Sequence, residues 1–413
     1  MKLAFWLTDI NKNIDIDKIG LGNPGIGGTS FLILLVAYEL NKRQEVDVTL
    51  YTSNQITSSL TLRVVNVKNV EDAVTAALND KQDIFVHTQG QVSESFYKMV
   101  SFTELNCITW VHNYLSHDEY KLIVSCPNVK RVIFVGQQLY DHYVDDRILV
   151  KSSFIFNCIP DANICKKEED RSAVVYCGAL IPQKGFLVLA KAWKQVYRCC
   201  PGTKLYVLGG GLYGEDNTQF KKSYLKHVSE PEGHVLSSVL FEGTINQNKE
   251  YYYRQCAVGV ANPSGKTETF CLSAVEFEQQ GIPVVTYNGF GLLDTVQNGV
   301  TGFRIRGHKK LAKKIIRLIE DKALNIQMGN QGQSFTNENF NTQKIIPQWI
   351  QACKSVLENQ DPEFVFSYKN YWNDLKWLRY CNYQLRKVMP FMPSVNAIEI
   401  HAKYFLKKWL KRK

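Results

Sequence analysis

The sequence lacks any Cys-x-x-Cys pair, although it contains 11 cysteines among its 413 residues. Without closely spaced pairs, a zinc ribbon or a thioredoxin-like redox site has no support. The odd total and the adjacent Cys199 and Cys200 suit unpaired thiols better than a disulfide framework. We therefore expect a protein of a reducing compartment, the cytoplasm.

Long apolar runs are also missing. The longest one, at 31–38, is far shorter than the ~20 residues that a membrane-spanning helix needs. The first ten residues meet Asp9 too early for a signal peptide. The sequence predicts a cytoplasmic protein that does not span a membrane, although such a chain can still bind the inner face of one.

Positive charge is concentrated in one segment. The net charge is +10, and residues 361–413 carry +7 of it, with eleven Lys or Arg against four Asp or Glu. The first 360 residues are therefore nearly balanced. This distribution indicates a globular body followed by a basic tail.

Short apolar runs alternate with helical patterns in two series. Strands are expected at 3–7, 46–51, 84–87, 108–111, 132–135 and 153–156, and then at 173–177, 204–208, 239–242, 257–261 and 283–286. Helices are expected at 30–40, 186–197, 248–255, 271–280 and 309–321. This alternation predicts an α/β fold with two parallel sheets, each covered by helices on both faces. We place the domain boundary near residue 168.

Two glycine-rich stretches lie near the start of the chain. Residues 20–25 match G-x-G-x-x-G, but they follow the first strand only after a long loop, and no acidic residue ends the second strand. A dinucleotide site is therefore not favoured. Gly27 and Gly28 run directly into the first helix, whose N-terminus can approach a phosphate. A flexible loop is the alternative.

A lysine and two glutamates follow strands of the second series. Lys184 would lie at the carboxyl end of strand 173–177, where its ammonium can neutralise a leaving diphosphate; a solvated surface lysine is the alternative. Glu268 lies before helix 271–280, and Glu276 lies inside it. Eight residues of helix rise ~12 Å, more than the ~5–9.5 Å between the carboxyl groups of a glycosidase. The pair can instead contact the sugar and the ribose of a nucleotide sugar, with the helix N-terminus facing the diphosphate.

Other polar residues are weaker candidates. His87 and His112 end predicted strands, and either one can contact a sugar or serve as a structural hydrogen-bonding group. Asp15 and Asp17 form an Asp-x-Asp sequence, but they lie in a polar loop with no nucleotide-binding region before it. We interpret this as coincidence and expect no metal site, since no other cluster has metal-ligand spacing.

Over residues 1–358, the chain resembles glycosyltransferase family 4, whose two Rossmann-like domains face each other across a cleft in the arrangement called GT-B. The resemblance depends on the order and spacing of several short motifs. They are Gly27-Gly28, Trp-Val-His112-Asn, Phe-Asn157-Cys-Ile-Pro160, Gly178-x-Leu-x-x-x-Lys184-Gly185, Leu205-Tyr-Val-Leu-Gly209, Leu240-Phe-Glu-Gly243, Glu268-x7-Glu276, Gly281-Ile-Pro-Val-Val and Asn298-Gly-Val-Thr-Gly302.

The resemblance implies sugar transfer from a nucleoside diphosphate sugar to a glycan or lipid-linked acceptor. The anomeric configuration would be retained, and no metal or other cofactor would be bound. It also implies a role in surface polysaccharide or glycolipid biosynthesis. Lys184 would bind the diphosphate, Glu268 would lie by the donor sugar, and Glu276 would bind the ribose. Further contacts with sugar or phosphate would come from His112, the Phe270 and Cys271 amides, and Gly27 and Gly28.

Three positions depart from the family pattern. Ala179 stands where the family usually has an arginine beside the diphosphate, Cys271 replaces a common glycine, and Asp294 replaces a common glutamate. Losing a charge-assisted contact costs ~1.5–3 kcal/mol. Two alternatives therefore stay open: a catalytically inactive binding protein, and a glycoside phosphorylase that uses free phosphate.

The expected organisation has four parts. Residues 1–168 form the acceptor-side domain, 169–343 the donor-binding domain, 344–358 a helix returning to the first domain, and 362–413 a basic, aromatic, helical tail. In the tail we expect Asn396 and Glu399 to form a capping box.

The last helix of this tail would carry an apolar stripe of Ile398, Ala402, Phe405 and Trp409, with lysines off the stripe. Such a helix is typical of the interface of an anionic membrane, where a lipid-linked acceptor would be presented. Packing of the stripe on the first domain is the alternative. Nucleic-acid binding is not expected, because the basic residues form a tail rather than a groove.

Overall fold

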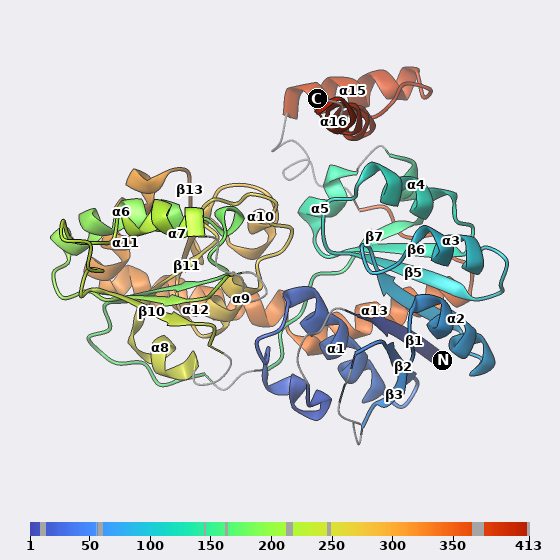
Figure 1. The fold of residues 1–413 in the computed structure, drawn as a ribbon, viewed down its shortest axis with the longest axis horizontal. Coiled ribbons are helices and arrows are strands. Elements are labelled where there is room, and N and C mark those ends of the chain that lie inside the picture. Colours follow the sequence, from blue (N-terminus) through green and yellow to red (C-terminus); the bar gives the residue numbers. More distant parts are fainter. Residues whose placement is uncertain are drawn as a thin grey trace. The chain divides into compact units, whose positions relative to one another are not determined.

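The computed structural model describes residues 1–8, 14–54, 56, 61–143, 146–161, 164–211, 218–245, 249–365 and 376–410. The chain divides into two compact units (Figure 1). The first comprises Met1–Leu21, Ile26–Cys158 and Thr342–Lys413, and the second comprises Gly22–Gly25 and Ile159–Asn341. The division after Cys158 comes earlier in the chain than the predicted boundary near residue 168. Helix α13 (Thr342–Leu357) covers most of the predicted helix 344–358 and belongs to the first unit.

The first unit contains a seven-stranded parallel sheet of order β3-β2-β1-β4-β5-β6-β7. Its strands are β1 (Lys2–Leu7), β2 (Asp47–Thr52), β3 (Arg63–Asn66), β4 (Ile84–Thr88), β5 (Asn106–Val111), β6 (Val129–Phe134) and β7 (Ser152–Phe154). Its connecting helices are α1 (Gly28–Asn41), α2 (Val70–Asn79), α3 (Glu94–Val100), α4 (His117–Ser125) and α5 (Gln137–His142), with 3-10 turns at Ile16–Leu21 and Arg147–Lys151.

Apolar residues cover both faces of this sheet. On one face, Trp349 of α13 packs against Phe5 of β1 and Trp110 of β5. On the other, Phe96 of α3 packs against Phe85 of β4. Successive residues of a strand point to opposite faces of the sheet. Because both faces are covered by helices, both sets of side chains are largely apolar, and such strands form nearly continuous apolar runs in the sequence.

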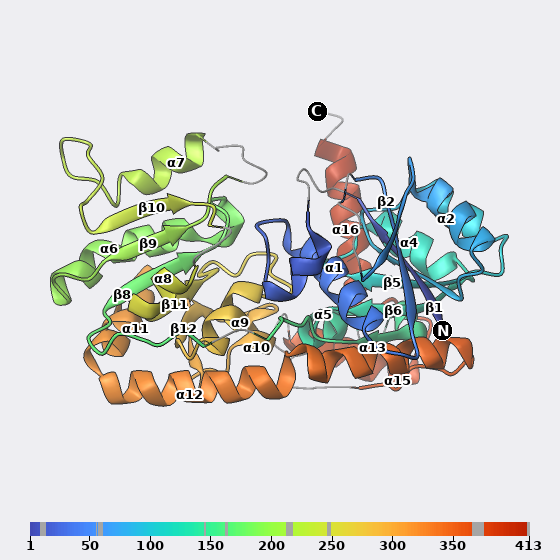
Figure 2. The same cartoon turned by 90° about the horizontal axis from the view of Figure 1, so that it is seen from below.

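The second unit contains a six-stranded parallel sheet of order β10-β9-β8-β11-β12-β13. Its strands are β8 (Ala173–Cys177), β9 (Leu205–Leu208), β10 (Val239–Gly243), β11 (Cys256–Ala261), β12 (Val284–Tyr287) and β13 (Gly302–Ile305). Its helices are α6 (Phe186–Cys199), α7 (Thr218–Leu225), α8 (Lys249–Gln255), α9 (Leu272–Gln279), α10 (Leu292–Thr295), α11 (His308–Glu320) and α12 (Lys322–Asn339). Figure 2 shows each unit turned by 90°.

Two buried clusters hold this second sheet between its helices. One includes Trp193 of α6 and Ile315 of α11, and the other includes Phe277 of α9 and Tyr253 of α8. In both units every predicted strand overlaps an observed one. Two strands were missed, β3 and β13, and each is a four-residue strand at a sheet edge.

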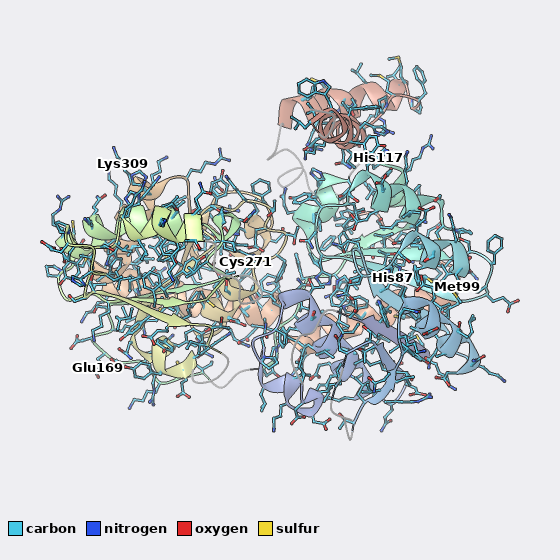
Figure 3. The ribbon with its side chains drawn as sticks, in the orientation of Figure 1. His87, Met99, His117, Glu169, Cys271 and Lys309 are labelled. Atoms are coloured by element: carbon cyan, nitrogen blue, oxygen red, sulfur yellow. The ribbon has the colours of Figure 1, made fainter. Side chains whose placement is uncertain are left out.

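The basic tail forms two helices, α15 (Lys376–Val388) and α16 (Val395–Leu410), which belong to the first unit. Its earlier aromatic residues, at 371 and 372, lie outside the described residues. The Asn396 side-chain amide donates to Asp146 Oδ2 (2.8 Å), and the His401 ring lies 4.5 Å from that of His117, which Figure 3 labels.

The capping-box prediction was wrong. Ser394 caps α16 by accepting the Ala397 N–H (3.0 Å), whereas Asn396 is buried against Asp146. The Glu399 carboxylate pairs with Lys403 rather than with the helix start. Contacts between α16 and the rest of the unit therefore include those of Asn396, His401 and Tyr404. On the apolar stripe, Phe405 and Trp409 are 63% and 56% exposed.

Candidate active site

The centre of the second sheet is a point where the strand order reverses. Strands β8 and β11 are neighbours there, and the loops that follow them, 178–185 and 262–271, leave the same edge of the sheet. In open parallel sheets, ligands bind outside the carboxyl ends of the strands at such a switch point. Lys184 and Glu268 belong to these two loops, so the topology alone brings them to one place.

The loop after β8 is held from inside by Tyr176. The tyrosine hydroxyl lies 2.9 Å from the Lys184 carbonyl and 3.3 Å from that of Ala179. Gly185 ends the loop with φ +75°, and a Cβ on it would lie 2.5 Å from the backbone nitrogen of Ser264. Only glycine allows the two loops to approach this closely.

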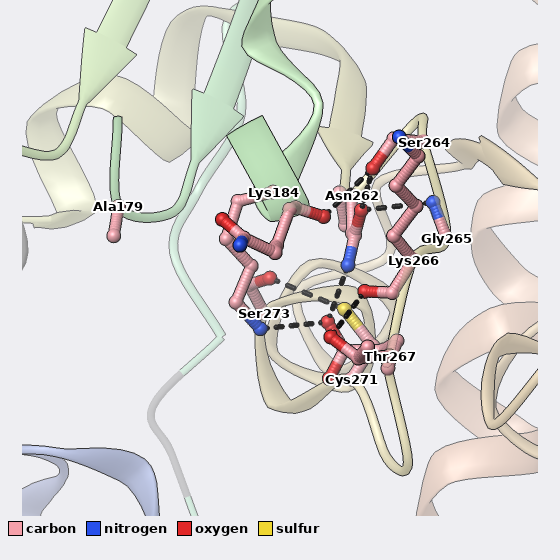
Figure 4. Close-up of polar contacts among 12 residues, drawn as sticks. Ala179, Lys184, Asn262, Ser264, Gly265, Lys266, Thr267, Cys271 and Ser273 are labelled. Atoms are coloured by element: carbon pink, nitrogen blue, oxygen red, sulfur yellow. Dashed lines mark hydrogen bonds and ion pairs between the residues drawn. The ribbon is translucent and has the colours of Figure 1, made fainter. Parts of the chain in front are cut away.

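The loop after β11 places a carboxylate beside the lysine. Asn262, at φ +36°, accepts the Gly265 N–H with Oδ1 (2.9 Å) and donates from Nδ2 to Glu268 Oε2 (2.7 Å). Lys184 Nζ lies 2.8 Å from the same glutamate oxygen. Glu268 is only 7% exposed, so the two donors compensate the burial of its charge. Figure 4 shows this network.

The charge of the pair follows from its surroundings. Burial would lower the pKa of Lys184, but the charge of Glu268 and the nearby Cys271 raise it, and the net pKa lies above the usual value. Burial, reinforced by Glu268, raises the pKa of the Cys271 thiol to about 12. At neutral pH the site therefore contains an ammonium group and a neutral thiol.

Helix α9 begins at Leu272, after the predicted start. Cys271 is its N-cap, without a side-chain cap hydrogen bond, and both Phe270 and Cys271 are buried. The first N–H groups of a helix have no partner within the helix, so this end can bind an anion. Glu276 is one turn inside α9.

A second Lys–Glu pair lies on α9. Lys249, the first residue of α8, places Nζ 3.0 Å from Glu276 Oε2, and the glutamate charge raises the pKa of the lysine. Tyr253 of α8 packs on Phe277 of α9 (5.6 Å), which brings the two helices together. We did not single out Lys249 from the sequence. The one feature of the sequence that could have indicated Lys249 is its position at the start of the predicted helix 248–255, after a strand.

Ala179 contributes no charge to this edge. Figure 4 shows Ala179 apart from the hydrogen-bonded network that includes Lys184. The Tyr176 hydroxyl still holds the backbone carbonyl of Ala179, but the side chain at position 179 is a single methyl group.

The predicted residues of the first unit lie at the carboxyl edge of its own sheet. Gly27 is the N-cap of α1, with open space where a Cβ would be, and Gly28 is the first residue of that helix. His112 follows β5; its ring packs on Trp110 (4.4 Å), its N–H donates to Gln89, and burial lowers its pKa to about 3.

His87 is part of the core rather than of this edge. It is 1% exposed, packs on Phe96 (4.6 Å) and forms a hydrogen bond with Thr109 (3.0 Å). These contacts favour the structural interpretation of His87.

Asp15 and Asp17 make ordinary loop contacts. Asp15 pairs with Lys18 (2.9 Å) and accepts the Asp17 N–H, and Asp17 accepts the Thr61 hydroxyl (2.6 Å). Over the described part of the chain, no group of three or more His, Cys, Asp or Glu side chains has the arrangement of a metal site. Metal independence stays a prediction.

Comparison with known proteins identifies the relatives of this chain. Residues 161–335, which lie in the second unit, match the family described as glycosyl transferases group 1. The lipopolysaccharide 1,2-N-acetylglucosaminetransferase of Salmonella typhimurium is 24% identical over 193 residues, 46% of this chain and 50% of that protein. The capsular polysaccharide biosynthesis glycosyltransferase CapM of Staphylococcus aureus is 28% identical over 182 residues, 43% and 44% of the two chains. The chain thus spans about half the length of these curated relatives.

Solved structures resemble the chain over a longer stretch. HepE of Anabaena in complex with UDP has a TM-score of 0.65 and 18% identity, covering 86% of this chain and all of that one. The sucrose-phosphate synthase of Thermosynechococcus elongatus has a TM-score of 0.68 and 17% identity, covering 87% and 100%. At such identities the likeness concerns the fold, and it confirms the predicted class of two Rossmann-like domains of the GT-B type.

Proposed function

We propose that this chain, whose residues 161–335 match the family described as glycosyl transferases group 1, is a retaining glycosyltransferase. It would move a sugar from a nucleoside diphosphate sugar to a glycan or a lipid-linked acceptor. The observation that supports this best is the pairing of Lys184 with Glu268 at the switch point of the second sheet, beside the N-terminus of α9.

The donor site follows from the charges at this edge. Lys184 is the cation for the diphosphate, and when the sugar leaves, its ammonium stabilises the charge that develops on the leaving group. Glu268 lies by the donor sugar, and the backbone amides at Phe270 and Cys271 bind sugar hydroxyls. Glu276 accepts hydrogen bonds from the ribose.

Residues of the first unit complete the proposal. Gly27 and Gly28 would allow a phosphate to approach the N-terminus of α1. His112, kept neutral by burial, would bind a hydroxyl of the transferred sugar.

No metal is required in this proposal. The ammonium of Lys184 and the N-terminus of α9 take the place that Mg²⁺ has in other nucleotide-sugar sites. Both act on the same diphosphate charge.

A ligand panel tests the function. Thermal shifts would be measured with nucleosides, nucleoside diphosphates and nucleotide sugars, because a ligand of the folded state raises stability by mass action. UDP and UDP-glucose are natural first probes, since HepE has been solved with both. A shift with a nucleotide sugar, followed by its turnover with a glycan or lipid-linked acceptor, would support the proposal. No shift with any of these nucleotides would contradict it.

Ala179 favours a second candidate, an inactive protein that binds a glycan or another enzyme. It lacks the cation that the family usually has there, whereas Lys184, Glu268 and Glu276 are all present. Nucleotide-sugar binding without turnover would identify this case. A glycoside phosphorylase would respond to free phosphate instead of a nucleotide.

We also propose that α15 and α16 bind the anionic inner face of the cell membrane, where a lipid-linked acceptor would be available. Exposed apolar residues lie on both helices and the turn between them: Leu378, Leu385, Val388, Phe391, Ile398, Phe405 and Trp409. The segment around them is basic, and each Lys or Arg near such a surface adds ~1 kcal/mol. None of the helices searched in the described residues is long and apolar enough to cross a membrane, so the contact would be peripheral.

Vesicle cosedimentation tests the membrane contact. Phe405→Ser with Trp409→Ser, and a truncation after residue 360, should lower binding to anionic vesicles. Phe102→Ser is the matched control, because Phe102 is a more exposed phenylalanine of the same unit outside the tail. Equal binding by the full chain and the truncation, or binding by neither, would contradict this part of the proposal.

A further inference from the structure

The Lys249–Glu276 pair lies at the same edge of the second sheet as the Lys184–Glu268 pair. Cys177, the last residue of β8, is close to both members of this pair. Burial raises the pKa of its thiol to about 11, while the Lys249 ammonium lowers that pKa and the Glu276 carboxylate raises it. Both charged groups are therefore close to the end of β8. Two Lys–Glu pairs therefore lie at this edge.

The helices that carry the second pair also contact each other through aromatic side chains. Tyr253 and Phe277 already join α8 to α9 through buried rings. The side chains of Lys249 and Glu276 are 25% and 22% exposed, so the pair is partly accessible from solvent. A partly exposed pair beside a ligand site can act on a charged ligand.

A ribose-binding carboxylate next to a diphosphate creates an electrostatic problem. Glu276 must be ionised and oriented to accept from ribose hydroxyls, yet its charge repels the phosphates joined to that ribose. Lys249 removes the repulsion by neutralising it. A carboxylate has about four acceptor positions, and the contact of Lys249 Nζ with Oε2 occupies one of them, so capacity for two hydroxyls is left.

We propose that Lys249 is a positioning residue of the donor site: by pairing with Glu276 it lets that carboxylate bind the ribose without repelling the diphosphate. This inference rests on the proposed function, in which Glu276 contacts the ribose. Lys249 acts through Glu276 and takes no part in bond breaking.

The dependence of binding on ligand charge tests the proposal. Uridine, UMP and UDP, and the same guanosine series, would be titrated against the full chain by ligand-observed NMR. In Lys249→Met the unpaired Glu276 should weaken UDP or GDP binding by about tenfold, the nucleoside monophosphate less, and the nucleoside least. A loss of structure alone would weaken all three equally.

Three further variants sharpen the test. Lys249→Arg keeps the positive charge and should keep diphosphate binding. Lys249→Met combined with Glu276→Gln removes both charges and should bind the diphosphate more tightly than Lys249→Met alone. Lys322→Met is the matched control: Lys322 pairs with Asp170 (2.7 Å), which precedes β8 at the opposite edge of the same sheet.

The outcomes separate the two proposals. If the wild-type chain binds no nucleoside diphosphate, the proposed function fails and the inference fails with it. If the wild type binds the diphosphate but Lys249→Met loses affinity equally for nucleoside and diphosphate, or loses none, the inference alone is overturned. A loss that grows with phosphate number and is reduced by Glu276→Gln supports it.

Discussion

The two sheets of this protein share the strand order of a Rossmann-like domain, but their carboxyl edges differ in chemistry. The edge of the second unit has two Lys–Glu pairs, one on two loops that approach closely at Gly185 and one between helices α8 and α9. The edge of the first has a glycine at a helix start with open space around it, and a buried, neutral histidine. A shared topology therefore defines where a ligand can bind, while the side chains decide whether that place suits a charged ligand.

Changing Glu268 should have the largest effect. Glu268→Gln keeps the size of the side chain but removes the charge that we propose lies beside the donor sugar, and we expect kcat to fall by ~10²–10³ with little change in donor affinity. Lys184→Met and Glu276→Gln should instead mainly weaken donor binding, because in the proposed site they contact groups present in both ground and transition states. Steady-state kinetics measure both. Glu169→Gln, an exposed glutamate of the same unit, is the control; wild-type kinetics in all three variants would refute the assignment.

The loops provide the next comparison. Gly185→Ala should destabilise the protein by ~3 kcal/mol or more, since it combines a positive φ with a Cβ 2.5 Å from the Ser264 backbone. Gly202→Ala, at φ +85° with nothing near its Cβ, isolates the cost of φ alone and should lose ~1 kcal/mol. Denaturant unfolding measures both.

Gly27→Ala should leave the free energy of unfolding nearly unchanged, because Gly27 has φ −55° and open space at its Cβ. If a phosphate approaches Gly27, this variant should nevertheless raise the KM for the donor. Unchanged kinetics would remove Gly27 from the proposed donor site, and donor binding would then be assigned to the edge of the second unit.

Acid should act in opposite directions through two buried histidines of the first unit and a buried glutamate of the second. Burial lowers the pKa of His87 and His112 to about 3, whereas the pKa of an unperturbed histidine is ~6.5. Between these two pH values the unfolded state binds more protons than the folded state. Their stabilisation is complete above pH ~6.5 and is lost as the pH falls, by up to ~1.4 kcal/mol per pH unit for each histidine.

Glu278 of the second unit should change stability with pH in the opposite direction. It is fully buried, accepts a hydrogen bond from the Thr301 hydroxyl (2.5 Å), and burial raises its pKa well above 4.5. The folded state therefore keeps a proton that the unfolded state loses, and stability rises as the pH falls through the raised pKa. Hydrogen exchange of β5 and β11 peptides in the full chain separates the units, and Glu278→Gln should flatten the response of the second one. Equal pH slopes in both units would contradict this reasoning.

The smallest effects are expected at Asp15 and Asp17. Asp15→Ala and Asp17→Ala remove only loop contacts and should change turnover less than about twofold, a difference of under ~0.5 kcal/mol. EDTA should likewise leave turnover intact. Complete loss with EDTA, restored by Mg²⁺ or Mn²⁺, would overturn metal independence and show that the charges of the second unit do not suffice.

The α/β class followed from the sequence alone, and so did an overlap with eleven of the thirteen strands in the described residues, because strands buried on both faces must be continuously apolar. Lys184, Glu268 and Glu276 could be named as well, since each follows a recognisable strand. The edge strands β3 and β13 give no such run, because β3 is exposed or half-buried along its length and β13 contains Arg304. Which groups pair was decided only by the tertiary structure. Lys249 reaches Glu276 because rings pack α8 on α9, and Asn396 contacts Asp146 instead of capping its helix, because contacts between residues distant in sequence depend on how the elements pack.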